Sequence, residues 1–346
     1  MTAAPHSTAA GVTPDAFLPS TSHNVVWGRI PTDRPPALRI KSGQTVSIDT
    51  VTHQGINKQD PITHFGAAGI APDQVLHDAV DIFKNTARPA QGAGAHVLTG
   101  PIHIEEALPG DMLEVRIRDI EFRVAYGQNH TAPGWGVLPE LLAQPASKVI
   151  RLDLARRVAL FSNDIEVPLA PFMGIMAVAP PGSTGISTKP PGSHGGNMDL
   201  KQLKAGATLY LPVFHAGALF YTGDGHAAQG DGEVDGTAIE ISLTPTLQFI
   251  VHPGAGTAMR WPRAEDAAHY CVMGMDADLD IALKNAVREA VELLKQKAGL
   301  SAAEAYALAS LSVDFRIAEA VNIIKVVYGM IPKQLFRHNP DYWRAN

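Results

Sequence analysis

The sequence predicts an α+β fold, in which mixed, sandwich-like or barrel-like sheets are joined to helices concentrated toward the C-terminus. Three observations carry this prediction. The 346 residues include 31 glycines and 26 prolines, spread along the chain as the turns between many short strands require. A glycine followed by alternating apolar residues recurs three times, and most of the amphipathic helical pattern lies after residue 277. Strands followed by helices favour α+β over a regularly alternating, doubly wound fold.

The recurring pattern predicts strands after three glycine turns. The segments "SGQTVSI" from Ser42, "PGDMLEVRI" from Pro109 and "AGATLYLPV" from Ala205 each place apolar residues third and fifth after the glycine. Such period-two alternation indicates a strand with one buried face. Further strands are expected over residues 148–154, 217–223, 237–244 and 246–252. Alternation in the third of these segments places Glu240 and Ser242 on one face.

The C-terminal part of the chain predicts two long helices. Residues 277–299 carry an apolar stripe at helical spacing, and Gly299 is the expected stop. Residues 301–311 open with Ser301 and carry Glu304 three positions later, which is a capping box. An earlier helix is expected over 73–86. Residues 313–329 are predicted to form a third helix, or a helix followed by a strand.

Composition bounds the class of protein. We expect an N-terminal arm, residues 1–40, and one main domain, residues 41–346, which could comprise two β-rich halves. A net charge of −6 without a basic block argues against a nucleic-acid partner. No apolar run approaches the roughly 18 residues of a membrane span, so no membrane association is expected. Cys271 is the single cysteine, which favours a cytoplasmic protein. The apolar faces of the C-terminal helices predict a homo-oligomer.

The stretch "GDGHAAQGDGEVDGTAIE", residues 223–240, raises a problem of charge. It holds five acids, and no Lys or Arg occurs between Lys204 and Arg260. Apolar strand sequence flanks the stretch, so some of the acids are expected to be desolvated. Desolvated carboxylates must be protonated, hydrogen-bonded or paired with a cation. A bound divalent metal would resolve this, and a Lys or Arg from elsewhere in the chain is the competing explanation.

Two other segments supply possible ligands. "HGGNMD" contains His194, Asn197 and Asp199, and "DTVTHQGIN" contains His53 beside a predicted strand end. Histidine with carboxylates and water suits Zn²⁺, whereas carboxylates, carbonyls and Asn suit Ca²⁺. A hydrogen-bonded structural role is the alternative for any one of these histidines. The sequence has no G-x-S-x-G nucleophile elbow, and Cys271 has the setting of a buried apolar residue.

Residues 194–240, from "HGGNMD" through "DGHAAQGDGEVDGTAIE", resemble the signature region of the acetamidase/formamidase family. The resemblance extends to "HVLTGPIHIEEALPGDMLEVRI" from His96, to "GMDADLDIALKNAVREAVELL" from Gly274 and to "SLSVDFRIAEAVN" from Ser310, and so covers most of the chain from about Lys41. Asp235 departs from the family pattern, which has Cys or a small residue there. Glu106 also departs from the pattern, because the family usually has glycine at this position. The resemblance implies hydrolysis of a short carboxamide, such as acetamide or formamide, to carboxylate and ammonia, and some members hold zinc or calcium.

Roles follow as hypotheses from the motif. The expected ligands of a divalent metal, Zn²⁺ before Ca²⁺, are His53, His194, Asp199, Asp224 and His226. Glu233 is the expected general base, with Asp224 and His226 also catalytic. Gly195, Asn197 and Gly223 are expected to bind the substrate, and Phe220, Tyr221 or Trp135 to wall its pocket. Two alternatives stay open. One is a metal-independent amidase using Lys189 with a carboxylate, and the other is a small-ligand binding protein on the same scaffold.

Overall fold

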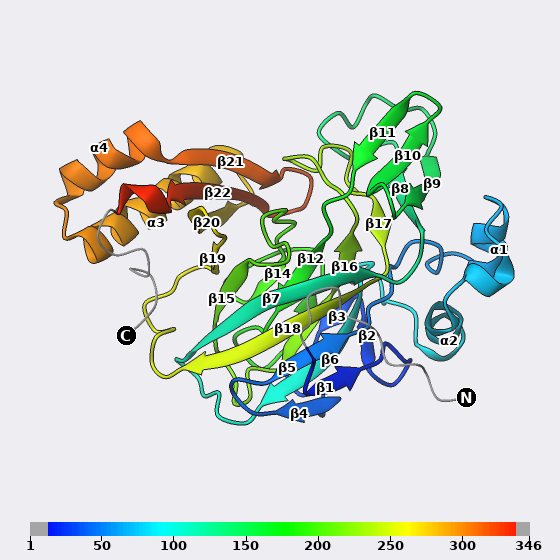
Figure 1. Ribbon diagram of the computed structural model, residues 1–346, viewed down its shortest axis with the longest axis horizontal. Coiled ribbons are helices and arrows are strands. Elements are labelled where there is room, and N and C mark those ends of the chain that lie inside the picture. The colour runs from blue at the N-terminus through cyan, green and yellow to red at the C-terminus, as the bar shows by residue number, and fades with distance from the viewer. Residues whose placement is uncertain (1–12, 337–346) are drawn as a thin grey trace.

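The computed structural model describes residues 13–336, which form two large sheets, a two-stranded ribbon and a few helices (Figure 1). The nine-stranded sheet runs in the order β1 (Ala16–Leu18), β5 (Thr45–Ile48), β18 (Leu243–His252), β7 (Met112–Phe122), β15 (Thr208–Pro212), β19 (Arg263–Glu265), β20 (His269–Asp276), β22 (Lys325–Pro332) and β21 (Asp314–Glu319). The main path of the eleven-stranded sheet is β11 (Ile165–Pro168), β10 (Val158–Ser162), β9 (Ala146–Asp153), β8 (Tyr126–Thr131), β17 (Glu240–Ile241), β16 (Phe220–His226), β12 (Phe172–Ala177) and β14 (Gly195–Asn197). The predicted β-rich α+β class is confirmed.

Three further strands join the second sheet through β16. β6 (Val97–Ile104) pairs with β16, and β2 (Val25–Trp27) and β4 (Leu38–Ile40) pair with β6. β3 (Arg29–Ile30) and β13 (Ile186–Ser187) form the separate ribbon. Both sheets are mixed, because β1 runs parallel to β5 and β4 runs parallel to β6, while their other pairings are antiparallel. From residue 16 onward the segment expected as an arm therefore pairs within the sheets, and residues 1–12 of it lie outside the described residues.

The main hydrophobic core lies between the two sheets. It includes side chains from β5, β7 and β18 of one sheet and from β6, β12 and β16 of the other. Phe220 of β16 meets Phe249 of β18 with ring centroids 5.0 Å apart at a near-perpendicular angle, a favourable aromatic geometry. Apolar residues on inward-facing strand positions thus hold the sheets together, and they fix β16 at the centre of the molecule.

The three glycine-turn segments form the predicted strands β5, β7 and β15. Gly43, Gly110 and Gly206 have φ angles of 94°, 95° and 91°, which side-chain-bearing residues rarely adopt. The repeated glycine is therefore required by the turn, and the apolar alternation after it by the core. Strands over 148–154 and 217–223 are also confirmed, as β9 and β16 with shifted ends.

The predicted end of one helix at Gly299 and the predicted capping box of the next are confirmed. α3 (Leu279–Ala298) starts at Asp278, whose side chain accepts a hydrogen bond from the Ile281 N–H, and ends at left-handed Gly299. α4 (Ala302–Ser312) has the reciprocal capping box of Ser301 and Glu304. The earlier elements are α1 (Pro61–Gly66), the 3₁₀ turn η1 (Pro72–Gln74) and α2 (His77–Asn85), so the predicted helix over 73–86 is shorter than expected. η2 (Lys333–Leu335) closes the described chain.

Two sequence predictions are corrected. Residues 313–329 contain no helix, because β21 and most of β22 occupy them and β22 pairs with β20 along its whole length. The β-branched side chains of Val326 and Val327 are buried in β22, and they suit a sheet position better than a helix. The strand expected over 237–244 is interrupted at Ser242, whose hydroxyl accepts a hydrogen bond from the Thr52 N–H. β17 and β18 consequently belong to different sheets.

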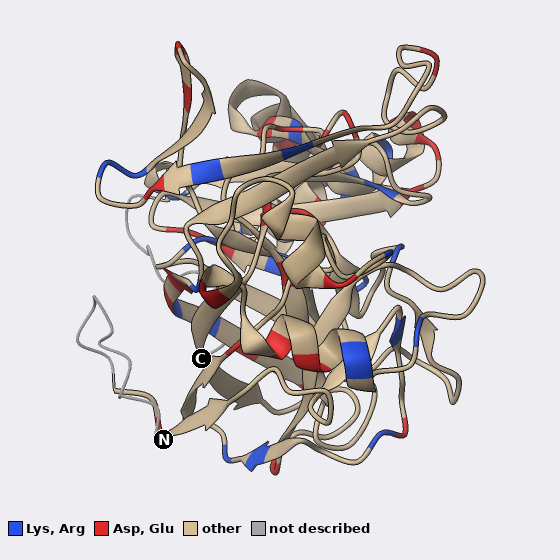
Figure 2. Ribbon diagram, turned by 90° about the vertical axis from the view of Figure 1, so that its right-hand side faces the viewer, with Lys and Arg blue, Asp and Glu red and all other residues tan. Residues whose placement is uncertain are grey.

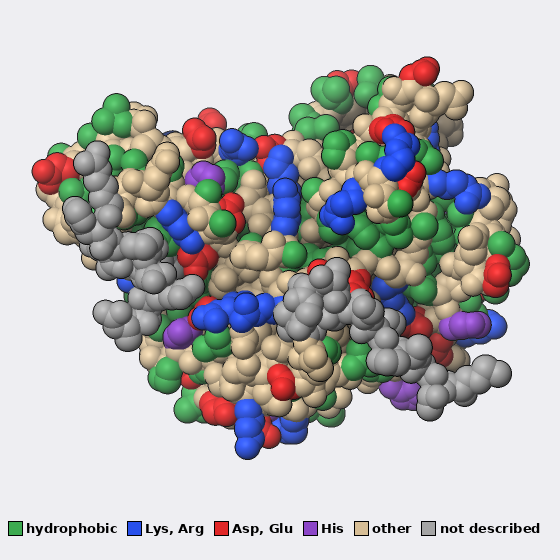
Figure 3. Space-filling model, viewed as in Figure 1, with side chains coloured by type: hydrophobic (Ala, Val, Ile, Leu, Met, Phe, Trp, Pro, Cys, Tyr) green, Lys and Arg blue, Asp and Glu red, His purple; other side chains and the backbone are tan. Residues whose placement is uncertain are grey.

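Two lobes of the molecule lie on either side of the upper ends of β12 and β16 (Figure 1). α3 and α4 pack with β20, β21 and β22 in one lobe, and β8 to β11 form the other (Figure 1). Between them the space-filling surface is indented (Figure 3). Lys and Arg are scattered among Asp and Glu over the view in Figure 2. None of the helices among residues 13–336 combines the length and apolar character needed to cross a membrane.

Candidate active site

β16 brings the acid-rich stretch into the centre of its sheet. It carries Asp224 and His226 and pairs with β12, β6 and β17. Glu240 of β17 lies opposite His226 in the register. Its Oε1 is 3.3 Å from His226 Nε2, and Asp224 Oδ2 is 3.5 Å from the same nitrogen. Strand pairing alone therefore gathers two carboxylates around one imidazole.

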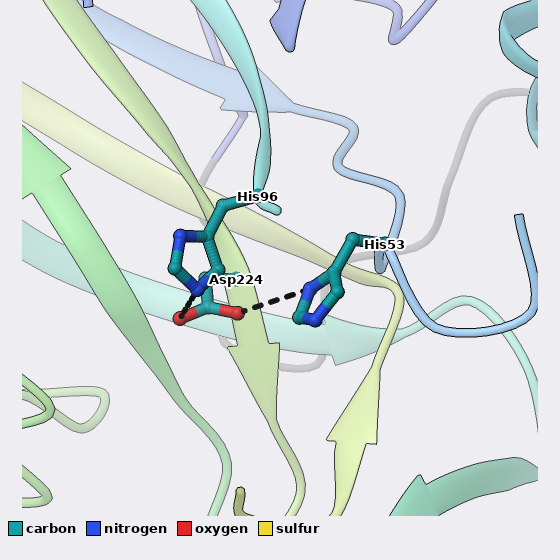
Figure 4. A group of neighbouring side chains, drawn as sticks. All are labelled: His53, His96 and Asp224. Atoms are coloured by element: carbon teal, nitrogen blue, oxygen red, sulfur yellow. Dashed lines mark ion pairs between the residues drawn. The ribbon is translucent and has the colours of Figure 1, made fainter. Parts of the chain in front are cut away.

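Two more histidines reach Asp224 from other segments. His53 follows β5, and its Nδ1 lies 3.7 Å from Asp224 Oδ1; His96 precedes β6, and its Nε2 lies 3.8 Å from Asp224 Oδ2 (Figure 4). The histidine rings stand nearly perpendicular, with centroids 5.0 Å apart. Asp224 is thus the point at which three separate parts of the chain meet.

The acids and histidines form three overlapping groups of possible metal ligands. They are His53, His96 and Asp224; Asp224, His226 and Glu240; and Asp199, His226 and Glu233. In each group, one ligand atom per residue lies within 4.8 Å of the others. We refer to these seven residues as the carboxylate–histidine centre. Imidazole nitrogens and carboxylate oxygens are a donor set that suits Zn²⁺, and the candidate sites for a divalent metal are therefore present.

Gly174 of β12 provides the close approach that this centre requires. A Cβ atom at this position would lie 2.6 Å from Asp199 Oδ1, 2.8 Å from Asp224 Oδ2 and 2.9 Å from His226 Cε1. A side chain on β12 would displace the acids, so glycine is needed for the cluster to form. The acids of the site therefore lie directly against the backbone of Gly174.

Three of the acids hold strained backbone conformations. Asp199, Asp224 and Glu233 have φ angles of 46°, 58° and 44°, although none is glycine. Such angles cost on the order of 1–3 kcal/mol each and persist where the surrounding structure enforces them, most often at functional sites. The strain turns these carboxylates into the centre instead of along a regular strand.

A cavity of about 300 Å³ opens above the centre. Asp199, Asp224, Glu233 and Glu240 line it together with His53 and His96. Asn197, Lys189, Trp135 and Ile323 complete its walls, and the last two side chains are 49% and 66% exposed. The acids are buried, whereas Lys189 and these two apolar residues are exposed. The cavity therefore has an acidic floor and a mixed, solvent-facing mouth.

Burial and mutual charge set the protonation of the centre. Burial raises the pKa of Asp199 and Glu233 well above their ordinary values, and raises that of Glu240 to about 7. Burial would also raise the pKa of Asp224, but His96 and His226 outweigh it and lower that pKa. Burial lowers the pKa of His53 to about 3. Asp224 is therefore the acid most readily ionised, and a bound cation would favour ionisation of the others.

The tautomer of His226 is fixed by Gln229. The Gln229 Nε2 group donates to the backbone oxygens of Asp199, at 2.9 Å, and Ala318, at 3.2 Å. Its Oε1 must consequently accept from His226 Nδ1, which lies 2.9 Å away. Burial would lower the pKa of His226, but the charges of Glu240 and Asp224 outweigh it and raise that pKa well above its ordinary value. Loss of the Nε2 proton leaves a lone pair on Nε2 that points at Asp224 and Glu240. This is the orientation that a metal ligand or a proton acceptor requires.

Several buried polar atoms of the site have no hydrogen-bond partner within the described chain. They include His53 Nδ1, Asp199 Oδ1, Asp224 Oδ1, His226 Nε2, Glu240 Oε2 and Asn197 Oδ1. Buried polar atoms are normally satisfied, so a cluster of unsatisfied ones indicates where a ligand or ion binds. These residues fit a divalent cation by chemistry and by position.

The predicted site residues fall into two sets. His53, Asp199, Asp224 and His226 lie in the centre with Glu233, and Asn197 and Trp135 line the cavity. Other residues stand apart from it. His194 is buried outside all three groups, and burial lowers its pKa to about 4. Phe220 and Tyr221 belong to apolar core clusters. The Gly195 N–H is bonded to the Gly192 oxygen, and Gly223 is held in β16 against β6 and β12.

Sequence reasoning missed four contributors: His96, Glu240 as a site residue, Gln229 and Gly174. His96 opens the "HVLTGP" segment but has no acid beside it in sequence. Glu240 was treated as an ordinary strand residue, although an acid in a strand buried on both faces is a signal in itself. The remaining acids of the stretch have other partners. Asp231 pairs with Lys201 at 3.0 Å, and Asp235 accepts from Asn129.

The fold and site define a β-rich protein with a buried carboxylate–histidine centre at the floor of a small-molecule cavity. The chain belongs to the acetamidase/formamidase family, whose model matches residues 19–184 and 180–338. It is 27% identical to an acetamidase of Mycolicibacterium smegmatis over 213 residues, which is 44% of this chain and 52% of that protein. It is 27% identical to a formamidase of Methylophilus methylotrophus over 202 residues, 43% of this chain and 50% of that one.

Solved structures extend the likeness to nearly the whole chain. The crystal structure of an acetamidase from Bacillus halodurans is 29% identical, with a TM-score of 0.76, and the match covers 93% of this chain and 98% of that one. A predicted acetamidase/formamidase from Thermoanaerobacter tengcongensis is 28% identical at the same TM-score, over 93% and 97% of the two chains. By sequence, however, the chain spans only about half the length of the curated relatives it matches.

Proposed function

We propose that the protein hydrolyses a short aliphatic carboxamide, such as acetamide or formamide, to a carboxylate and ammonia. The observation that carries this proposal is the convergence of four acids and two histidines on one small-molecule cavity. Membership of the family agrees with it. No cysteine lines the cavity within the described chain, because Cys271, the single cysteine, is buried in the core. Water activated by acid–base groups is therefore the nucleophile that the site supports best.

A divalent cation, Zn²⁺ before Ca²⁺, is the proposed cofactor. Asp224 is the proposed central ligand, joined either by His53 and His96 or by His226 and Glu240, because one ligand atom per residue in either group lies within 4.8 Å of the others. Bound there, such a cation supplies a lowered pKa for water and polarises a carbonyl oxygen. Asp199 and Glu233 form a separate group with His226.

Glu233 is the proposed general base. It is buried, lines the cavity and is held at a strained φ of 44°. In the reaction, water oxygen bonds to the amide carbon and the carbon–nitrogen bond breaks. Glu233 accepts a proton from the water and delivers it to the leaving nitrogen, so that carboxylate and ammonium result. The side-chain amide of Asn197 lines the same cavity and orients the substrate.

The test is release of ammonia from formamide, acetamide and propionamide, together with analysis of bound metal. Glu233→Gln is expected to lower kcat by about 10²–10⁴-fold, the usual contribution of a positioned acid or base. The matched control is Glu292→Gln, which changes an acid paired with Lys295 on the surface of α3 and leaves the site intact. Normal turnover by the Glu233 variant would exclude it as the base.

Chelation separates the metal-dependent proposal from the metal-independent alternative. Loss of activity on chelation and recovery with Zn²⁺ support the former. The alternative needs Lys189 beside a carboxylate, yet none of the ion pairs in the described chain includes Lys189. A binding protein on this scaffold would be stabilised by amides without releasing ammonia.

We also propose a cytoplasmic homo-oligomer, supported by the cysteine content and by the exposed apolar side chains of Val137, Leu138 and Leu141.

A further inference from the structure

Lys189 is the single Lys or Arg among the described residues that line the cavity. The other titratable groups in the lining are the four acids and two histidines, His53 and His96. Burial lowers the pKa of both histidines, which favours their neutral form. Lys189 is exposed, and its ammonium takes part in no ion pair or hydrogen bond of the described chain. A cavity built around acids therefore has one unpaired cation at its mouth.

The backbone beneath Lys189 is fixed. Thr188 is fully buried, and its Oγ1 lies 3.0 Å from His96 Nδ1. The Lys189 N–H donates to Ser187 Oγ at 3.2 Å, and two prolines follow. Proline restricts the residue before it to extended conformations, so the Lys189 side chain projects from a rigid base beside His96. Its position at the mouth is a property of the fold and not of a mobile loop.

The cavity is larger than acetamide requires. Its volume is about 300 Å³, where one water molecule needs ~10–15 Å³ on the same measure. Acetamide carries a single methyl group beyond its amide, whereas the cavity walls include the apolar side chains of Trp135, Val321 and Ile323. An amide held at the acidic floor could therefore extend an alkyl chain past apolar walls toward the lysine.

We propose that the substrate is an amide whose short alkyl chain ends in a carboxylate, a monoamide of a small dicarboxylic acid, and that Lys189 binds this carboxylate. The proposal rests on the amidase function argued above and names its substrate class. The uncharged amide enters the acidic floor, and the anionic end stays at the mouth, away from the acids. Water and the monoamide yield the dicarboxylate and ammonium, so no further reactant is needed.

The test compares malonamate, succinamate and glutaramate with neutral and cationic analogues of the same length. The neutral analogue of succinamate is 4-oxopentanamide, in which a methyl group replaces one carboxylate oxygen, and the cationic analogue is 4-aminobutanamide. We expect kcat/KM for the best monoamide to exceed that of its neutral analogue about tenfold, equivalent to ~1.4 kcal/mol. Raising the salt concentration should reduce this preference, since the pair is solvent-exposed.

Lys189→Met should bring the ratio of anionic to neutral kcat/KM close to one, and Lys189→Glu should turn the preference toward the cationic amide. Lys204→Met, a change at an exposed lysine outside the cavity lining, is the matched control and should keep the ratio. A ratio unchanged by both Lys189 substitutions overturns the proposal. An equal loss on every amide, acetamide included, also overturns it, because Lys189 would then act on the reacting amide.

A binding measurement separates failure of this inference from failure of the amidase function. Calorimetric titration with succinate, the product of succinamate, reads the carboxylate subsite without turnover. Weaker succinate binding by the Lys189→Met protein, by about tenfold, supports the subsite even if no amide is cleaved. Equal binding by the wild type and the variant rejects the subsite. Absence of ammonia release from every amide rejects the amidase proposal alone.

Discussion

The centre of the molecule and its C-terminal lobe are built by opposite rules. In the lobe, α3 and α4 follow from their own sequence, because caps, apolar stripes and a terminal glycine specify each helix locally. At the centre, the seven residues come from segments near positions 53, 96, 199, 226 and 240, and three acids sit on strained backbone. The helices of the lobe are specified by residues within each helix. The site, in contrast, forms because strand pairing in the sheets brings buried acids together.

The largest effects are expected from replacing one glycine by alanine in each region. The change should reduce activity in the centre and stability in the lobe. At Gly174, a Cβ would meet the movable ends of acidic side chains, so Gly174→Ala should leave the fold intact. It should also lower kcat/KM by about 100-fold or more, as misplaced reacting groups do. At Gly274, a Cβ would lie 2.1 Å from the Ala286 backbone nitrogen of α3. Gly274→Ala should cost about 1–3 kcal/mol of unfolding free energy, or more, through over-packing.

Ammonia release and denaturant unfolding measure the two losses. A Gly174→Ala protein with full activity would show that the acids need not converge as described. A Gly274→Ala protein with unchanged stability would show that α3 does not press on β20.

Glu319, at the end of β21, is expected to make the unfolding free energy depend on pH, unlike an exposed acid on α3. Burial raises its pKa to about 7, although its Oε2 accepts from the Val321 and Asn322 N–H groups. A carboxyl whose folded pKa is raised favours the folded state at low pH, and this stability is lost as pH rises through about 7. Glu319→Gln should therefore gain stability relative to wild type between pH 5 and pH 9, by up to roughly 3 kcal/mol.

Denaturant unfolding of both proteins at the two pH values checks this. Glu292→Gln on α3 is the control and should show no such change, since its side chain is half-exposed. A constant difference between wild type and the Glu319 variant would mean that Glu319 is charged in the folded protein throughout.

Gln229 tests whether the site depends on a fixed histidine tautomer. Gln229→Ala removes the acceptor of the His226 Nδ1 proton and should lower kcat/KM and metal affinity by about 10–100-fold. Selective ¹⁵N labelling of histidine should show that His226 loses its bias toward the Nδ1–H form. Gln248→Ala is the matched control, because that amide bonds to Gly43 in the nine-stranded sheet, away from the cavity. Unchanged His226 shifts in the Gln229 variant would contradict the assignment.

The same contrast explains what the sequence could predict. The glycine turns before β5, β7 and β15, the end of α3 at Gly299 and the capping box of α4 could be predicted, because each is encoded within a few residues. Asp224, His226 and Glu233 were recoverable because their motif is contiguous. His96 and Glu240 were not, since their role depends on β6 and β17 pairing with β16. The strands β21 and β22 were missed in part because tertiary pairing with β20 overrides a helix-like local pattern.

The smallest expected effect lies in the lobe, at the capping box of α4. Ser301→Ala removes a hydroxyl that accepts from the Glu304 N–H, and should cost ~1 kcal/mol of unfolding free energy. Because α4 lines no part of the cavity within the described residues, kcat/KM should not change. Ser301→Asp restores a capping acceptor and should recover most of the lost stability. If Ser301→Ala lowered turnover at unchanged stability, the lobe and the centre would be coupled, and the division between locally and globally specified regions would fail.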